Sequence, residues 1–130
     1  MITEKRKHVL IVDDEEVIVA VLRRYVTMAG YDQETAMNGR EALERVAANP
    51  PDLILLDLMM PEMNGFEACR QIRSNPATAK IPVIVLTALR SQSDSQEARN
   101  CGATEFIVKP VTGEELVKRL KHYLGSPFKV

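Results

Sequence analysis

The chain has 130 residues, of which 45% are hydrophobic and 27% charged, as in an ordinary soluble globular domain. Its formal net charge of −1 excludes a general electrostatic attraction to nucleic acid or anionic lipid. The apolar run behind the N-terminal basic stretch is too short for a signal sequence or a membrane span, so we expect a cytoplasmic protein. We expect a single domain with its core at residues 6–124 and a loose tail at 125–130.

Short β-rich runs alternate with segments of helical periodicity along the whole chain. The predicted strands are His8–Val12, Gln33–Ala36, Leu53–Leu56, Pro82–Leu86 and Phe106–Val108. Strict alternation of this kind is typical of βαβ units around a parallel sheet. With right-handed crossovers it predicts a doubly wound (βα)5 α/β sandwich, flavodoxin-like, with five parallel strands in the order 2-1-3-4-5.

The first three predicted helices carry apolar stripes. In the helix Glu15–Met28 we expect an inward stripe made of Val17, Ile18, Val21, Leu22, Tyr25 and Met28. The second helix begins near Gly39, and its expected inward residues are Ala42, Leu43, Val46 and Ala47. The third precedes Asn75 and turns Phe66, Cys69 and Ile72 inward.

The last two predicted helices differ in how well they are anchored. Residues Ser91–Asn100 are almost wholly polar, so we expect this fourth helix to be the most mobile element. The fifth helix, Thr112–Leu124, opens with a capping box formed by Thr112 and Glu115. Its expected inward residues are Leu116, Leu120 and Tyr123.

Polar residues follow the predicted strands where ligands bind in open parallel sheets, beyond the carboxyl ends. They are Asp13 and Asp14 after the first strand, Asp57 after the third, Thr87 after the fourth and Lys109 after the fifth. Close carboxylates repel by about 4 kcal/mol per pair at an effective dielectric near 20, so a cation must lie among them. Lys109 supplies one charge, and Mg²⁺, a hard ion that takes carboxylate oxygens, suits the remainder. Such a cluster is suited to form an aspartyl phosphate at Asp57.

Each of these residues also has a purely structural interpretation. Asp13 and Asp14 stand at the start of a predicted helix, where negative charge interacts favourably with the helix dipole. Thr87 could be an ordinary β-branched strand residue, and the Lys109 side chain could simply extend from the end of its strand into solvent. Their joint occurrence at four strand ends favours phosphate chemistry.

The histidines and cysteines show no ligand spacing. We expect His8 and His122 at the surface. Cys69 and Cys101 are interpreted as small buried hydrophobes, with a disulfide as the less favoured alternative.

Four stretches, "VLIVDDE", "DLILLDLMMPEMNGFE", "IPVIVLTA" and "CGATEFIVKP", resemble the receiver domain of two-component response regulators, in the family's order and spacing, over residues 6–124. The resemblance implies that Asp57 is the phosphoacceptor and Asp14 the principal metal carboxylate, with Asp13 beside it. Asp57 itself and the backbone carbonyl of Met59 would complete the protein's share of the Mg²⁺ shell. Thr87 would donate its hydroxyl to a phosphoryl oxygen, and Lys109 would pair with another.

The resemblance also implies a switch that couples Thr87 to Phe106. Phosphorylation would draw Thr87 inward and let Phe106 turn, which would reshape the face of helix four, strand five and helix five. That face is also a candidate surface for a weak homodimer. The alternative is that Phe106 is a core aromatic that never moves.

The chain departs from the family pattern at a few positions. Asn64 stands where aspartate is common and Val111 where phenylalanine is common, and neither position supplies chemistry. The resemblance also implies that the positions of Met59 and Leu89 border the path of a hydrolytic water. Neither side chain can hydrogen-bond that water to orient it, which predicts slow self-dephosphorylation. Ala88 is small and would leave the phosphoryl site open to a donor.

The sequence thus predicts a signalling receiver that takes a phosphoryl group from a phosphohistidine on a sensor histidine kinase or phosphotransfer protein. Its output would be binding to a downstream target protein, without nucleic acid or membrane insertion and without external turnover that would make it an enzyme. The short tail favours a standalone protein or an excised domain. Three rivals stay open: a phosphorylation-independent docking module, a Mg²⁺-dependent phosphatase, and the receiver part of a larger regulator or hybrid kinase. The phosphatase is disfavoured because Met59 stands where a second acid would be needed.

Overall fold

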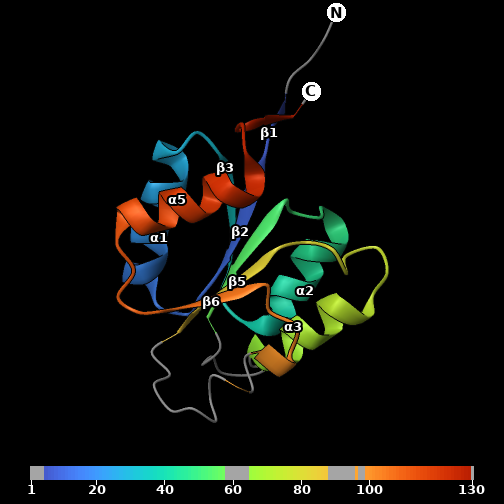
Figure 1. Cartoon of the computed structure of the whole chain (residues 1–130). Helices are drawn as coiled ribbons and strands as arrows, with labels where there is room; N and C mark the ends of the chain where they lie inside the picture. Colours follow the sequence, from blue (N-terminus) through green and yellow to red (C-terminus); the bar gives the residue numbers. More distant parts are fainter. Residues whose placement is uncertain (1–4, 58–64, 88–95, 97–98, 130) are drawn as a thin grey trace, which may run out of the picture.

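Five parallel strands form the centre of the molecule in the computed structural model, which describes residues 5–57, 65–87, 96 and 99–129 (Figure 1). The strands are β2 (His8–Val12), β3 (Asp32–Ala36), β4 (Leu53–Leu56), β5 (Val83–Thr87) and β6 (Glu105–Val108). They lie in the order β3-β2-β4-β5-β6, and every neighbouring pair is parallel. Counted along the chain, this is the predicted order 2-1-3-4-5, so the expected fold is confirmed.

Helices cover both faces of the sheet. The helices α1 (Glu16–Met28) and α5 (Gly113–Leu124) lie on one face, and α2 (Gly39–Ala48) and α3 (Gly65–Ser74) lie on the other (Figure 1). Most of the expected fourth helix lies outside the described residues, although Gln96, Arg99 and Asn100 are helical. The result is a three-layer α/β sandwich.

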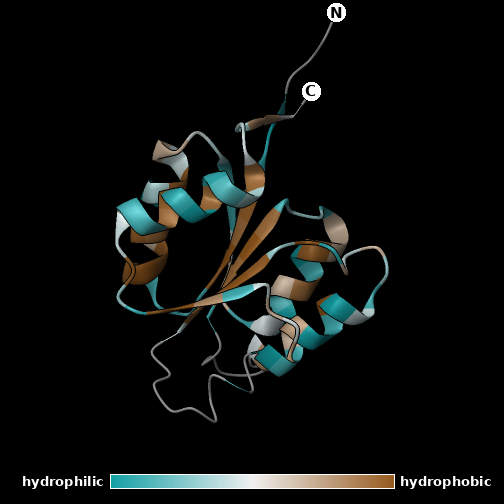
Figure 2. Ribbon diagram, in the orientation of Figure 1, coloured by the Kyte–Doolittle hydropathy of each residue, from teal (hydrophilic) through white to brown (hydrophobic). Residues whose placement is uncertain are grey.

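The apolar core is divided by the sheet into two halves. Leu10 and Val12 of β2 pack with α2 and α3, whereas Val9 and Ile11 pack with α1 and α5. Figure 2 shows the inner strands β2, β4 and β5 as strongly hydrophobic, as expected for strands covered on both faces. β4 illustrates this, because all four of its residues are buried.

The expected inward stripe of α1 was wrong in part. The buried residues are Val19, Leu22 and Val26. Val17 and Met28 are 75% and 74% exposed, and Val21 is 41% exposed. At 3.6 residues per turn, Val17, Val21 and Met28 lie on the side of α1 opposite to the three buried residues. The predicted stripe therefore combined residues from two different faces of the helix. In α2, Ala47 is likewise exposed rather than inward.

The helix starts follow the expected capping chemistry. The Thr112 side chain accepts a hydrogen bond from the Glu115 backbone N–H at 3.1 Å, as the capping box predicts. Asn38 caps α2 in the same way, through the Glu41 N–H at 2.8 Å.

The expected loose tail was wrong, because the end of the chain pairs with its beginning. The strand β1 (Lys5–Arg6) pairs antiparallel with β7 (Phe128–Lys129), and we call this two-stranded sheet the clasp. The Tyr31 hydroxyl donates to the Gly125 carbonyl at 2.8 Å, and the Lys7 N–H donates to the Pro127 carbonyl at 2.5 Å. Pairing between two short, distant segments produces no hydrophobic periodicity in a six-residue tail, so the sequence did not indicate it.

Among the described helices, none combines the length and the apolar character needed to cross a lipid bilayer.

Candidate functional site

Backbone hydrogen bonds align the carboxyl ends of the strands at one edge of the sheet. The Asp13 N–H donates to the Ala36 carbonyl at 3.1 Å, and the Asp57 N–H donates to the Val12 carbonyl at 2.9 Å. On the other side, the Lys109 N–H donates to the Thr87 carbonyl at 2.7 Å. The parallel register therefore brings the polar residues at or directly after the carboxyl ends of β2, β4, β5 and β6 to one edge of the sheet, as the sequence predicted.

Three carboxylates meet at this edge. Asp13, Asp14 and Asp57 each offer an oxygen, and these oxygens lie within 4.8 Å of one another. Asp13 is 2% exposed and Asp57 is 6% exposed. Carboxylates so little hydrated must be compensated by cations or by hydrogen bonds.

Among the described residues, Lys109 provides positive charge that compensates these carboxylates. Its Nζ lies 3.0 Å from Asp13 Oδ2 and 3.9 Å from Asp57 Oδ1, and its side chain is 18% exposed. One ammonium group pairs with two of the three carboxylates, so within the described residues the carboxylates outnumber the lysine that pairs with them. The charge argument made from the sequence thus holds in the structure.

The donor set fits Mg²⁺. Hard carboxylate oxygens on three short side chains are the ligands that this ion takes, together with water and phosphate oxygens. Asp13 already has donors on both oxygens, because Glu15 N–H donates to Oδ1 at 3.0 Å and Lys109 donates to Oδ2. All three carboxylates stay candidates for holding the ion, and the role of Asp14 as the principal metal carboxylate stays a prediction.

Thr87 and Phe106 lie on adjacent strands beside this cluster. Thr87 ends β5 and is 2% exposed. Phe106 on β6 is paired with Val85 in the strand register, is half-buried, and packs against the core on the α2 and α3 face. On β5, therefore, only Leu86 lies between Thr87 and the register position of Phe106. The other predicted site residues, Met59, Ala88 and Leu89, lie outside the described residues.

An apolar cavity next to the cluster was missed from the sequence. It has a volume of about 350 Å³ and is lined by Ile18, Val21, Leu22, Leu86, Lys109, Pro110 and Val111. The sequence carried no clear signal for it, because Val21 was expected in the inward stripe and Val111 packs against the edge of the core. Because Lys109 belongs to both places, whatever enters this cavity lies next to the carboxylates.

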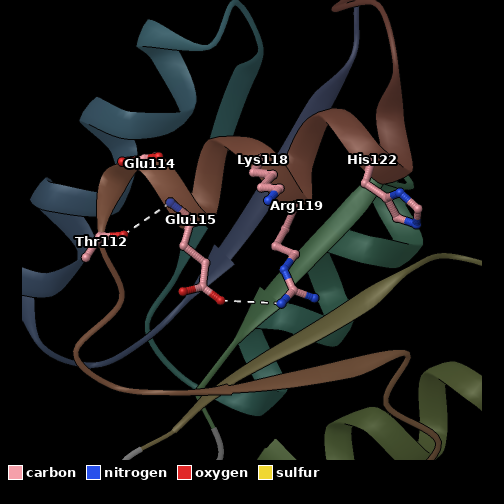
Figure 3. A pocket seen from close by; sticks show the side chains of 6 residues that line it. All are labelled: Thr112, Glu114, Glu115, Lys118, Arg119 and His122. Atoms are coloured by element: carbon pink, nitrogen blue, oxygen red, sulfur yellow. Dashed lines mark hydrogen bonds and ion pairs between the residues drawn. The ribbon is translucent and has the colours of Figure 1, made fainter.

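A second hollow, of about 560 Å³, lies along α5 (Figure 3). Its lining is charged and includes the Glu115–Arg119 ion pair at 3.4 Å and the exposed Lys118. Arg119 also pairs with Glu105 of β6, which accepts a hydrogen bond from the Tyr123 hydroxyl at 2.5 Å. This network joins α5 to the strand that carries Phe106.

The expected surface position of His8 was wrong. Its side chain is 12% exposed, and its ring nitrogens lie 3.6 Å from Glu34 and 3.8 Å from Asp52. His8 opens β2, an interior strand, so Glu34 on the neighbouring β3 and Asp52 just before the neighbouring β4 flank it. His122 is exposed, as predicted.

Comparison with known proteins agrees with this geometry. The family model of the response regulator receiver domain matches residues 9–121. Response regulator MprA of Mycolicibacterium vanbaalenii is 40% identical over 116 residues, which are 89% of this chain and 49% of that protein. Response regulator PleD of Caulobacter vibrioides is 41% identical over 113 residues, which are 87% of this chain and 25% of that protein. The chain thus spans about half, or less, of these relatives.

Two solved structures are also similar. Chemotaxis protein CheY4 of Vibrio cholerae has a TM-score of 0.85 and 37% identity, covering 92% of this chain and 100% of that one. The receiver domain of sensor histidine kinase PA1611 from Pseudomonas aeruginosa has a TM-score of 0.87 and 28% identity, covering 94% and 100%. That structure holds a magnesium ion coordinated in its active site cleft.

Proposed function

The chain belongs to the response regulator receiver domain family of two-component systems, and on this premise we propose that Asp57 accepts a phosphoryl group from a phosphohistidine in a Mg²⁺-dependent reaction. The donor would be a sensor histidine kinase or a phosphotransfer protein in the cytoplasm. The observation that carries the proposal is the meeting of three carboxylates within 4.8 Å beside the Lys109 ammonium.

The residues divide the chemistry among them. A carboxylate oxygen of Asp57 attacks phosphorus, the bond from phosphorus to the donor nitrogen breaks, and its electron pair stays on the imidazole. Asp14 and Asp57 would hold Mg²⁺, and the bound ion would neutralise negative charge on the phosphoryl oxygens. Lys109 offers a second positive charge, and the Thr87 hydroxyl is a donor for a phosphoryl oxygen.

Output would follow from a change at Thr87 and Phe106. A phosphoryl group adds about −1.5 to −2 charges at neutral pH, which draws the Thr87 hydroxyl toward the phosphorylated site. The space that Thr87 leaves would allow the Phe106 ring to turn inward. The face of β6 and α5 would then bind a downstream protein or a second copy of the chain. Intact carboxylates and the absence of a second acid at Met59 support a switch rather than a docking module or a phosphatase with external turnover.

The lifetime of the phosphoryl group is proposed from the sequence alone, because Met59, Ala88 and Leu89 lie outside the described residues. Neither Met59 nor Leu89 can hydrogen-bond a hydrolytic water, so self-dephosphorylation would be slow. Replacement of Met59 by asparagine should shorten the lifetime of the acyl phosphate. A lifetime that is unchanged or longer in Met59→Asn would contradict this.

The test is intact mass after incubation with acetyl phosphate, with and without Mg²⁺. Wild type should gain one phosphoryl group only with Mg²⁺, and Asp57→Asn should gain none. Asp32→Asn, an exposed carboxylate at the start of β3, is the matched control and should behave as wild type. A gain that persists in Asp57→Asn would refute Asp57 as the acceptor. No gain in wild type, even with a purified histidine kinase, would favour the docking module.

A further inference from the structure

The outward side of α1 is apolar along much of its length. Val17, Val21 and Met28 are three of the six large hydrophobic residues that are exposed in the described part of the chain. Ala20, which is also exposed, lies between the two valines. Single exposed apolar residues are ordinary, but a contiguous row of them on one helix indicates a surface that another molecule covers.

Charged residues without a partner flank this apolar row. Glu16, Arg23 and Arg24 are exposed, and none of the ion pairs between described residues involves them. The helices α2, α3 and α5 instead each pair their own charges, through Glu41 and Arg45, Glu67 and Arg70, and Glu115 and Arg119. In α1 this is impossible, because Glu16 and Arg24 are about 12 Å apart along the helix axis at 1.5 Å per residue.

The helix dipole explains only one of these three charges. Glu16 lies in the first turn of α1, where a carboxylate is stabilised by the dipole. Arg23 and Arg24 lie before the last turn, which contains no basic residue, so the dipole does not account for them. The two arginines are therefore available to a negatively charged group outside this chain.

The pattern along α1 is complementary to itself when a second α1 runs antiparallel. Glu16 and Arg24 are each four residues, or about 6 Å, from Ala20, and the three share one row of i and i+4 positions. A two-fold axis at Ala20 therefore brings Glu16 of each copy level with Arg24 of the other, and both pairs form at once. A parallel arrangement would instead place like charges together. The small side chain of Ala20 allows the two helices to approach closely at the axis.

Two hollows beside the row offer space for side chains of a second copy. One is the apolar cavity of about 350 Å³ described above, to which α1 contributes Ile18, Val21 and Leu22. The other has a volume of about 280 Å³ and is lined by Ala20, Arg23, Arg24, Thr27 and Gln33. The surface of α1 is thus apolar at its row, charged at both ends and hollowed on its flanks.

We infer that two copies of this chain associate through α1, antiparallel about a two-fold axis near Ala20, with Glu16 of each copy paired to Arg24 of the other. This face is separate from the face of β6 and α5, and the inference does not depend on phosphoryl acceptance at Asp57. A contact between two single helices buries less than the roughly 1,200 Å² at which stable interfaces begin, so the dimer is weak. While it lasts, α1 is unavailable to other partners.

The test is sedimentation equilibrium of the full chain over about 10 µM to about 1 mM, the range in which a weak dimer forms. The average mass of wild type should rise from the monomer toward the dimer. Glu16→Arg and Arg24→Glu should each weaken association by about tenfold or more, because each change places like charges together twice. An equimolar mixture of the two variants should dimerise again, because both pairs then regain opposite charges. Lys118→Glu, an exposed position on α5, is the control and should dimerise as wild type.

Three results would overturn the inference. One is a wild type that stays monomeric at the highest concentration, which would assign the row to a different protein. Another is a pair of variants that dimerise alone as wild type does, or that stay monomeric when mixed. The third is an equal loss in Lys118→Glu and Arg24→Glu, which would place the interface on α5.

Circular dichroism checks that the charge variants fold. Ala20→Lys, which places two like charges at the axis, repeats the test if Glu16→Arg disturbs the start of α1, and it should be monomeric. Asp57→Asn should dimerise as wild type, so failure of this inference is distinguishable from failure of the phosphoryl-acceptor proposal.

Discussion

The guanidinium group of Arg99 lies over the ring of Phe106, with Cζ 5.2 Å from the ring centroid. Phe106 is half-buried on β6, three residues before Lys109, and Arg99 is exposed. A cation over an aromatic face at an exposed site stabilises that arrangement by about 0.5–1 kcal/mol. The contact thus favours one position of the ring that the proposed switch would move.

Arg99→Gln should therefore let the Phe106 ring populate other positions more often, while Arg99→Lys keeps part of the effect. Fluorine NMR of protein labelled with fluorophenylalanine measures this, because the chain has only three phenylalanines and Phe106→Leu assigns the signal. An unchanged shift and linewidth in Arg99→Gln would show that the contact does not hold the ring.

Lys109→Met should tighten Mg²⁺ binding severalfold and reduce phosphoryl acceptance. The ammonium lies 3.0 Å from Asp13 and 3.9 Å from Asp57, so it competes with a metal for the same negative charge. Calorimetric titration with Mg²⁺ measures the affinity, since the chain has no tryptophan to report it. Lys118→Met, an exposed lysine of α5, is the matched control. Weaker Mg²⁺ binding in Lys109→Met would mean that the lysine supports the metal site.

Arg73→Ala should lower the free energy of unfolding by about 2–4 kcal/mol, because several partly buried carbonyl groups lose a charged donor at once. Its guanidinium donates to Gly102, Ala79 and Ile81 carbonyls and to the Thr104 hydroxyl at 2.6–3.0 Å. Arg73→Lys cannot reach all four acceptors and should recover little. Urea unfolding followed by circular dichroism gives the values.

The control for this change is Arg70→Ala, on the same helix. Arg70 makes an exposed ion pair with Glu67 at 3.4 Å, so its loss should cost less than about 0.5 kcal/mol. Equal losses in Arg70→Ala and Arg73→Ala would contradict the importance of the Arg73 hydrogen bonds.

Tyr31 should make the protein less stable at alkaline pH. Burial raises the pKa of its phenol, whereas in the unfolded chain a tyrosine ionises near pH 10. Above that pH the unfolded state binds fewer protons than the folded state, so stability falls as pH rises. Tyr31→Phe removes this slope and the hydrogen bond to Gly125, at a cost of about 1 kcal/mol near neutral pH.

Thermal unfolding between pH 7 and 11 checks the alkaline effect. Tyr25→Phe, which alters a half-buried phenol beside the same core cluster, controls for loss of a hydroxyl group as such. Parallel pH profiles for wild type and Tyr31→Phe would show that the Tyr31 phenol does not contribute.

Sequence periodicity predicted the strands well, because strands such as Leu53–Leu56 are buried on both faces and allow no polar residue. The residues after the strands were also placed correctly, since parallel register brings Asp13, Asp57 and Lys109 together whatever the helices do. Periodicity failed at α1, where Val17 and Met28 are apolar and exposed. Hydrophobic character alone could not separate the face of α1 that enters the core from the face that does not.

Contacts between residues that are far apart in the chain could not be predicted from the sequence. The flanking of His8 by Glu34 and Asp52 depends on which strands neighbour β2. The hydrogen bonds of Arg73 depend on how the turn before β6 packs against α3. None of these has a fixed spacing along the chain, so each required the structure.

The clasp gives the molecule one further property. Arg6 pairs with Phe128 and Lys5 with Lys129, so residues 5 and 129 lie side by side, just before the start of β2 and close to both ends of the chain (Figure 1). A connector of a few residues between them would make the backbone circular. New termini opened at the exposed Pro76–Ala77 turn would then give a circular permutant that begins near β5. Its strands would keep the spatial order β3-β2-β4-β5-β6, because that order is held by pairing and packing and not by where synthesis starts.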